Sequence, residues 1–185
     1  MNNIVTKEMI ELYKVRNKEK HTWGDISVKF GECSVQLMIN SDYGHFAYNW
    51  FSTGPNPKEF LCRLSMDYTM NKLTSGDIYI FDMDKNLLET KKIIIEKRRN
   101  NMISKEIAKI CYDEMLEFFK ESNDMNYVMN LITKHKYCDE IFDEWEFIPH
   151  FTKIKSNIIN FWNDIWILFI KKIQEELKEE KLSKV

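Results

Sequence analysis

Apolar and polar residues alternate through most of the first fifty positions of the chain. In three consecutive segments the apolar side chains fall on every second position and so share one face, as in a half-buried β-strand. The segments are residues 23–30, 33–39 and 45–51. Gly31 and the run Asn40 to Gly44 supply turn-forming residues between them. The pattern predicts an antiparallel meander of three to four strands within residues 1–52.

Residues 5–16 fit two patterns. Met9, Leu12 and Tyr13 suit the stripe of an amphipathic helix, whereas Met9 and Tyr13 also fall on one face of an alternating strand. A strand is favoured, because a strand pattern follows directly and residues 17–20 would make a polar turn. A helix is the alternative.

From Pro57 onward, apolar residues recur every three or four positions, which is the spacing of an amphipathic helix. The predicted helices are residues 57–73, 84–100, a segment that begins at Ser104, and residues 123–137 and 153–181. Asp84 is the expected N-cap of the second helix, because a carboxylate accepts hydrogen bonds from the unpaired N–H groups of a first turn. Strands followed by helices predict an α+β fold. We expect a single domain over residues 1–185, with the helices of residues 57–182 packed on or beside the sheet.

The composition narrows the function classes. A net charge of −2 suits neither a protein that binds nucleic acid by bulk attraction nor an acidic mimic of nucleic acid. Four cysteines without a CxxC pair indicate reduced, buried thiols rather than a zinc site. Charged residues such as Asp164 interrupt the apolar run of residues 154–173, which predicts a packed helix and no membrane span. No metal, cofactor or secretory signal is expected.

Two stretches carry a family resemblance. Residues 41–50 read SDYGHFAYNW, and residues 60–73 read FLCRLSMDYTMNKL. They resemble short proteins of tailed bacteriophages and prophages, which show SDYG-x-[aromatic]-x-[aromatic]-x-W and then FL-x-x-L-x-x-D-Y-x-x-x-K-L. The basic run of residues 89–99 and the aromatic residues of the last helix extend the resemblance loosely over residues 41–177.

The resemblance implies an accessory protein of a phage or mobile element that works in the cytoplasm of the bacterial host. Small phage proteins of this kind often bind host machinery, including defence systems. The expected partner is therefore a host protein or ribonucleoprotein complex, and the expected function is inhibition of a host defence nuclease complex of the CRISPR type.

The turn before the last predicted strand gathers the candidate partner-binding residues Asp42, Tyr43, His45 and Trp50. Asp42 and His45 would also suit general acid–base work, so a small enzyme centred on this pair is an alternative function. In the simpler structural interpretation, Asp42 accepts backbone hydrogen bonds, Gly44 relaxes the turn and the aromatic rings pack on the sheet. No catalytic residue is assigned, because the sequence shows no nucleophile or oxyanion motif nearby.

The predicted helix over residues 84–100 carries a cluster of basic side chains. The candidate nucleic-acid-binding residues are Lys91, Lys92, Lys97, Arg98 and Arg99. They would form a face that meets phosphates, so association with nucleic acid is a further alternative function. The last helix has an apolar stripe through which two copies of the chain would pair, and a homodimer through this helix is also expected.

Overall fold

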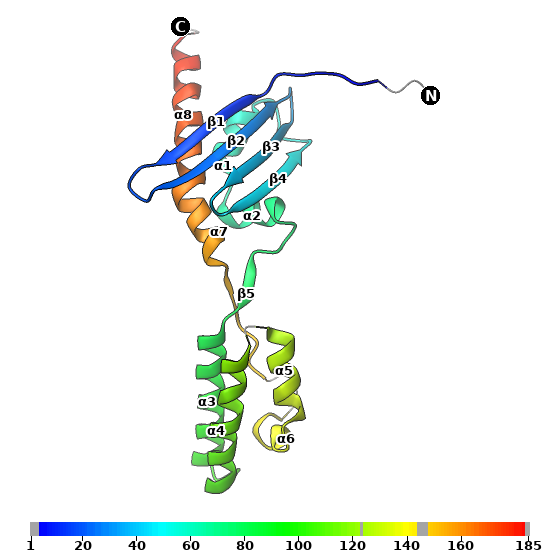
Figure 1. Ribbon diagram of the computed structural model, residues 1–185, viewed down its shortest axis with the longest axis vertical. Coiled ribbons are helices and arrows are strands. Elements are labelled where there is room, and N and C mark those ends of the chain that lie inside the picture. The colour runs from blue at the N-terminus through cyan, green and yellow to red at the C-terminus, as the bar shows by residue number, and fades with distance from the viewer. Residues whose placement is uncertain (1–3, 123, 144–147, 184–185) are drawn as a thin grey trace. The chain divides into compact units, whose positions relative to one another are not determined.

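The structure confirms the predicted α+β fold (Figure 1). The computed structural model describes residues 4–122, 124–143 and 148–183. The chain forms two compact units, which we call the sheet unit (residues 1–78 and 154–185) and the helical unit (residues 79–153). The predicted single domain stays a prediction, because compactness does not measure how far the folding of the two units is coupled.

The sheet unit contains the predicted meander, and the meander has four strands. They are β1 (Glu11–Asn17), β2 (Thr22–Phe30), β3 (Val35–Ser41) and β4 (Gly44–Trp50). Each strand pairs antiparallel with the next, in the order β1-β2-β3-β4. The strand favoured for residues 5–16 is confirmed from Glu11 onward and is wrong for residues 5–10, which form neither strand nor helix. Gly44 has a φ of +132°, which glycine adopts easily, and so β4 begins directly after a tight turn.

Helices from both parts of the sheet unit cover one face of the sheet (Figure 1). They are α1 (Pro57–Arg63), α2 (Met66–Leu73), α7 (Ser156–Phe161), the π-helical turn η2 (Trp162–Trp166) and α8 (Ile167–Leu182). The predicted single helix over residues 57–73 is wrong, because it is interrupted at Ser65. The side chain of Ser65 caps α2 by accepting a hydrogen bond from the N–H of Tyr68 at 3.3 Å. The predicted start of the last helix is wrong too, since Lys153 lies in the strand β6 (Thr152–Ile154).

The core of the sheet unit lies between these helices and the apolar face of the sheet. The sheet contributes Val15, Ile26, Val28, Val35, Leu37, Ile39, Phe46 and Trp50, and the last three helical segments contribute Ile158, Phe161, Ile165, Trp166, Phe169, Ile173 and Leu177. The stripe predicted for the last helix is therefore buried within its own chain. A homodimer through this helix would use its remaining faces, and it stays a prediction.

Helix and sheet approach each other very closely at Gly24 in β2. A Cβ atom at this position would lie 2.6 Å from Cγ2 of Ile165 in η2. This separation is shorter than a normal carbon–carbon contact, so η2 can pack this closely against the strand only because Gly24 has no side chain. The π turn places two successive buried residues, Asp164 and Ile165, at this contact.

The helical unit begins with β5 (Tyr79–Phe81), which pairs with β6. Its helices are α3 (Met83–Arg99), α4 (Lys105–Glu121), α5 (Met125–Lys134) and α6 (Cys138–Ile141). The prediction of Asp84 as the N-cap of α3 is wrong, and its side chain is 94% exposed. The cap is Asp82, because β5 ends immediately before it and its carboxylate accepts a hydrogen bond from the N–H of Lys85. The predicted helix of residues 123–137 corresponds to α5, and Asn123 lies outside the described residues.

Asn86 of α3 hydrogen-bonds to the backbone of Phe151, in the segment that precedes β6. Its side chain is fully buried, and Nδ2 donates to the carbonyl oxygens of Asp82 and Phe151, each at 2.7 Å. Its Oδ1 accepts a hydrogen bond from the N–H of Phe151, also at 2.7 Å. A single amide thus pairs with the backbone of Phe151 as a neighbouring strand would.

We expect Gly24→Ala to lower the free energy of unfolding by about 1–3 kcal/mol, because the added methyl group overlaps Ile165 and forces η2 away from the strand. Urea denaturation followed by tryptophan fluorescence measures the change. Ser27→Ala, on the opposite face of the same strand, is the control and should change the free energy by less than about 0.5 kcal/mol. Equal stability of Gly24→Ala and the unchanged protein would contradict the close contact.

Candidate functional site

Two turns at one end of the sheet meet η2 and gather polar side chains around Tyr43. Asp42 Oδ2 accepts a hydrogen bond from the backbone N–H of Trp23 at 2.8 Å. Asp42 thus has a structural role, although the donor lies in β2 rather than in its own turn. The hydroxyl of Tyr43 donates to Oδ2 of Asp164 at 2.6 Å. Lys20, from the β1–β2 turn, places its Nζ 2.6 Å from the other carboxylate oxygen of Asp164.

Asp164 is the buried centre of this cluster and is 3% exposed. Burial alone would raise its pKa, but hydrogen bonds from Lys20 and Tyr43 and the charge of Lys20 lower the pKa below its usual value. Burial, followed by the hydrogen bond to Asp164, raises the pKa of Tyr43, so the phenol stays protonated and donates. A paired carboxylate and a protonated phenol fix two turns to the helix and offer no activated nucleophile.

Sequence reasoning missed Asp164. The available signal was a carboxylate within an apolar helical stripe, since a buried charge of this kind needs partners. Those partners come from turns more than a hundred residues away, and nothing local identifies them.

The four candidate partner-binding residues do not form one surface. Trp50 is 5% exposed and lies in the core, on the covered face of the sheet. His45 is exposed on the opposite, open face, where it is the cross-strand neighbour of Asn40. Within the described part of the chain, no hydrogen bond or ion pair joins His45 to Asp42. The structure therefore separates the members of this set into turn, core and open face.

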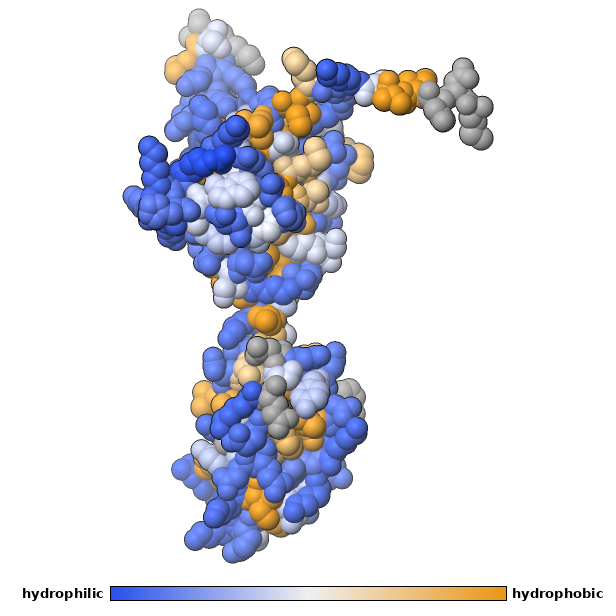
Figure 2. Space-filling view, viewed as in Figure 1, coloured by the Kyte–Doolittle hydropathy of each residue, from blue (hydrophilic) through white to orange (hydrophobic). Residues whose placement is uncertain are grey.

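The open face of the sheet carries a partly apolar row that crosses all four strands, and we call it the central row. In the strand register, Leu12 lies opposite Ser27, and Ser27 lies opposite Met38. Met38 lies opposite Ala47. Leu12 is 52% and Met38 47% exposed, although the solvated face of an antiparallel sheet is normally polar. Figure 2 shows apolar surface on this side of the sheet between hydrophilic regions.

Polar side chains border the central row on both sides. The bordering rows are Lys14, Asp25, Asn40 and His45 on one side and Lys29, Gln36 and Asn49 on the other. Arg16 and Asp25 form an ion pair at 2.7 Å, and Lys29 pairs with Glu8. A hollow of about 580 Å³ lies over the central row. An apolar centre within a polar border is the anatomy of a protein–protein interface.

The segment before β1 adds apolar surface. Residues 4–10 are exposed and form neither helix nor strand. Ile4, Val5 and Met9 are 84%, 96% and 95% exposed. An extended segment with free backbone groups and exposed apolar side chains is suited to adding a strand to another protein.

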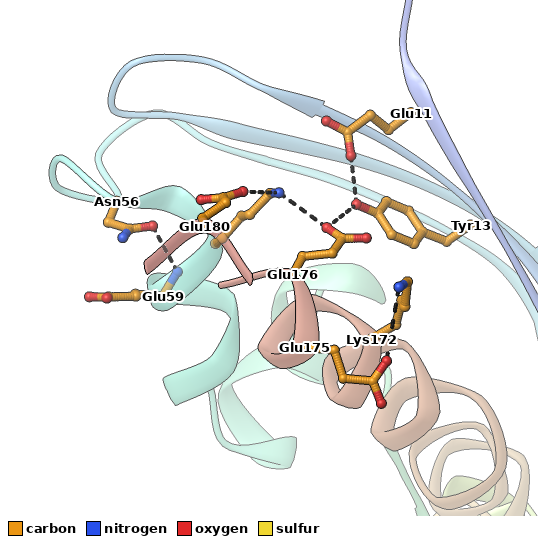
Figure 3. A network of polar contacts seen from close by, with 9 residues as sticks. Glu11, Tyr13, Asn56, Glu59, Lys172, Glu175, Glu176 and Glu180 are labelled. Atoms are coloured by element: carbon orange, nitrogen blue, oxygen red, sulfur yellow. Dashed lines mark hydrogen bonds and ion pairs between the residues drawn. The ribbon is translucent and has the colours of Figure 1, made fainter. Parts of the chain in front are cut away.

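A second polar network joins β1, α1 and α8 (Figure 3). The hydroxyl of Tyr13 lies 2.5 Å from Glu11 and 3.0 Å from Glu176. Lys58 Nζ lies 3.1 Å from Glu176 and 2.8 Å from Glu180. Burial, followed by the bonds to the two glutamates, raises the pKa of Tyr13 well above its usual range, so it remains a donor. The network ties the first strand to two helices.

The five candidate nucleic-acid-binding residues lie on different sides of α3. Lys97 forms an ion pair with Asp143 at 2.5 Å, and Lys92 pairs with Glu89 at 2.7 Å. The other three, Lys91, Arg98 and Arg99, border α4. The structure therefore divides the predicted basic face.

The helices α3 and α4 enclose a small groove, which we call the basic groove. It has a volume of about 280 Å³ and is lined by Ile94, Ile95, Arg98, Arg99, Ala108, Lys109 and Tyr112. The Nζ of Lys91 lies 5.8 Å from the ring centroid of Tyr112. Sequence reasoning missed Lys109 and Tyr112 because it took one helix at a time. Their spacing from Lys105, at i+4 and i+7, was the available signal of a shared face.

Metal sites and membrane-spanning helices were also considered. Over residues 4–122, 124–143 and 148–183, no group of three or more His, Cys, Asp or Glu is placed to hold a metal ion. None of the helices in those ranges is long and apolar enough to cross a membrane.

All four cysteines are free. Cys111 and Cys138 are buried as predicted, and burial raises the pKa of Cys111 to about 11. The prediction of buried thiols is wrong for Cys33, which lies in the exposed β2–β3 turn rather than in β3, and for the half-buried Cys62.

Comparison with known proteins gives a family match over most of the chain. A family model described as a phage family, Phage_phiTE_072, matches residues 4–179. The match spans the sheet unit and the helical unit. No curated protein and no solved structure matches the chain.

We expect Asp164→Asn to lower the free energy of unfolding by about 1–3 kcal/mol near neutral pH, because charge-assisted bonds to Lys20 and Tyr43 are lost. The pKa of Asp164 in the folded protein lies below the unfolded value of about 3.9. The carboxylate therefore contributes its full stability above about pH 4 and loses it as pH falls through the folded pKa.

Urea denaturation of both proteins between neutral pH and about pH 3 measures this contribution. The difference in stability between the unchanged protein and Asp164→Asn should shrink as the pH falls. Asp113→Asn, which changes an exposed carboxylate of α4, is the control and should show neither effect. A difference that stays constant over the whole range would contradict the paired, ionised Asp164.

Proposed function

Because the chain belongs to the Phage_phiTE_072 phage family over residues 4–179, we propose that it is a phage accessory protein that acts by binding a host protein through the open face of its sheet. The observation that carries this proposal is the central row, in which Leu12 and Met38 remain about half exposed within a polar border. Exposed apolar patches with polar rims are typical of surfaces that bind other proteins.

The chemistry of the open face favours a protein over a small molecule. The hollow above the central row is lined by side chains from all four strands, so its floor is broad. Small-molecule sites, in contrast, enclose most of the ligand surface. Met38 at the centre is unbranched and adapts its shape to a partner, which explains why methionine is enriched at interfaces.

The polar border would supply specificity. Two charges of the border already have partners within the chain, because Asp25 pairs with Arg16 and Lys29 pairs with Glu8. His45 stands at the β4 end of its row with an exposed ring. Of the four residues expected to bind a partner, it is the one that belongs to this surface. Charges at the rim of an interface select partners more than they add affinity.

The partner proposed is a host defence nuclease complex of the CRISPR type, in the bacterial cytoplasm. Inhibition of such a complex requires only that a working surface be covered, and a protein that covers it needs no chemistry of its own. This agrees with the structural use of the two polar clusters around Asp164 and Glu176, which link elements of the fold.

Capture from a bacterial lysate tests the binding surface. Tagged protein is incubated with lysate of a CRISPR-bearing strain, with and without nuclease treatment, and bound proteins are identified by mass spectrometry. We expect a stoichiometric protein partner that survives nuclease treatment and is lost with Met38→Glu, because a charge at the centre of the apolar row would be buried unpaired.

Leu88→Glu is the matched control, since Leu88 is 51% exposed on α3 and belongs to the helical unit rather than to the sheet unit. This variant should retain the partner. Far-UV circular dichroism and thermal melting show whether both variants fold. Retention of the partner by folded Met38→Glu would refute the open face as the binding surface.

Plaque counts test the cellular effect. Expression of the protein in a CRISPR-bearing host should raise the plaquing efficiency of a phage that the host targets, whereas the Met38→Glu variant should not. The same phage on a host without CRISPR is the control and should plaque equally well in all cases. Unchanged plaquing with the unmodified protein would argue against inhibition of this defence.

A further inference from the structure

The charge of the helical unit is unevenly distributed along its sequence. Residues 91–112 contain seven Lys and Arg against two Glu, whereas the rest of the unit contains five Lys and Arg against thirteen Asp and Glu. The basic stretch comprises the second half of α3, the connection to α4 and the first turns of α4. A local excess of one sign on an otherwise acidic unit marks a surface for a ligand of the opposite charge.

The cations of the basic groove are available to a ligand. Lys91, Arg99 and Lys109 take part in no ion pair among the described residues, and the side-chain bond of Arg98 goes to the neutral amide of Asn101 at 3.3 Å. Backbone and Ser104 hydrogen bonds, followed by the charges of Lys105 and Arg98, lower the pKa of Glu106, so Arg98 has a carboxylate nearby, whereas Lys91, Arg99 and Lys109 form no ion pair within the described ranges. Basic groups without acidic partners attract polyanions and release bound counterions when they meet them.

The floor of the groove adds a second kind of contact. Ile94, Ile95 and Ala108 line it, and Tyr112 forms one wall with 38% of its surface exposed. The volume of about 280 Å³ is below the range of roughly 300–1,000 Å³ that drug-sized ligands occupy. A group no larger than a single base is therefore small enough to enter it. Aromatic side chains beside cations bind unpaired bases by stacking.

We propose that the basic groove binds single-stranded nucleic acid, with phosphates on Arg98, Arg99 and Lys109 and one base stacked against Tyr112. A base must leave a duplex to reach the ring, so a single strand binds more tightly than a duplex of the same sequence. This site belongs to the helical unit and goes beyond the protein-binding function proposed for the open face of the sheet.

Fluorescence anisotropy with a labelled oligothymidylate of about 15 nucleotides tests the proposal on the full-length protein. The double variant Arg99→Gln/Lys109→Gln should bind at least tenfold more weakly. Its plot of log affinity against log salt concentration should be shallower by about 1.4, which is about 0.7 for each cation removed. The matched control Lys85→Gln/Lys120→Gln changes the same two helices by the same charge at exposed positions outside the groove. It should bind within about twofold of the unchanged protein.

Tyr112→Leu separates stacking from charge. It should weaken binding to the oligothymidylate by about fivefold or more and leave the salt slope unchanged, because it removes an aromatic surface and no charge. Met38→Glu should bind the oligonucleotide as the unchanged protein does. Loss of the protein partner with Met38→Glu and loss of the oligonucleotide with the groove variants therefore test the two proposals separately.

Three outcomes would overturn the site. Equal loss in the two double variants would mean that bulk charge rather than the groove holds the strand. Equal affinity for the single strand and a duplex, with Tyr112→Leu unchanged, would refute base stacking. Absence of binding at low salt would exclude nucleic acid as the ligand, and binding of an acidic peptide instead would assign the groove to a protein.

Discussion

Ile165 packs against the backbone of β2 at Gly24, and this contact decides how the C-terminal helix lies on the sheet. The π turn that carries Ile165 also carries Asp164, whose carboxylate is held by Lys20 and Tyr43 from two separate turns. The apolar and polar parts of the contact support each other. Close packing excludes water from Asp164, and hydrogen bonds to an ionised group are stronger where water is excluded.

The sheet unit depends on this contact because of its topology. The four strands precede the helical unit in sequence, and the long helix that covers them follows it. The two chain ends at the junction are joined: the N–H of Lys155 donates to the carbonyl oxygen of Ile78 at 2.9 Å, and its Nζ pairs with Asp77 at 2.5 Å. The entropy cost of closing a loop grows slowly with its length, so a compact insertion between adjacent ends is compatible with a stable sheet unit.

Local patterns in the sequence predicted the parts of the structure that depend on near neighbours. Alternation located β2, β3 and β4, and turn chemistry explained Gly44, whereas the hydrogen bond that Asp42 accepts comes from Trp23 in another strand. Features set by distant partners could not be predicted. Asp82 rather than Asp84 caps α3, where it also meets Lys153 at 3.1 Å, far along the chain. The division into two units begins at β5, a strand of three residues that is too short to show a period.

The same distinction applies to the candidate sites. Lys91 and Arg98 were found because a basic run is visible on one helix, whereas Tyr112 belongs to the next helix and joins them only through packing. Met38 has a visible signal, since it is apolar between two core residues where alternation calls for a polar one. That signal does not say whether the open face is covered. Only the arrangement of the helices in the structure shows this.

The open face and the basic groove share an apolar centre and differ in how their charges are arranged. On the open face, opposite charges are paired within the chain, as in Arg16 with Asp25, so the rim exerts little attraction over long distances. Around the groove, Arg99 and Lys109 carry charge of one sign and have no acidic partner among the described residues. Paired charges suit recognition of a protein surface by fit, whereas unpaired cations suit a ligand with repeated negative charges.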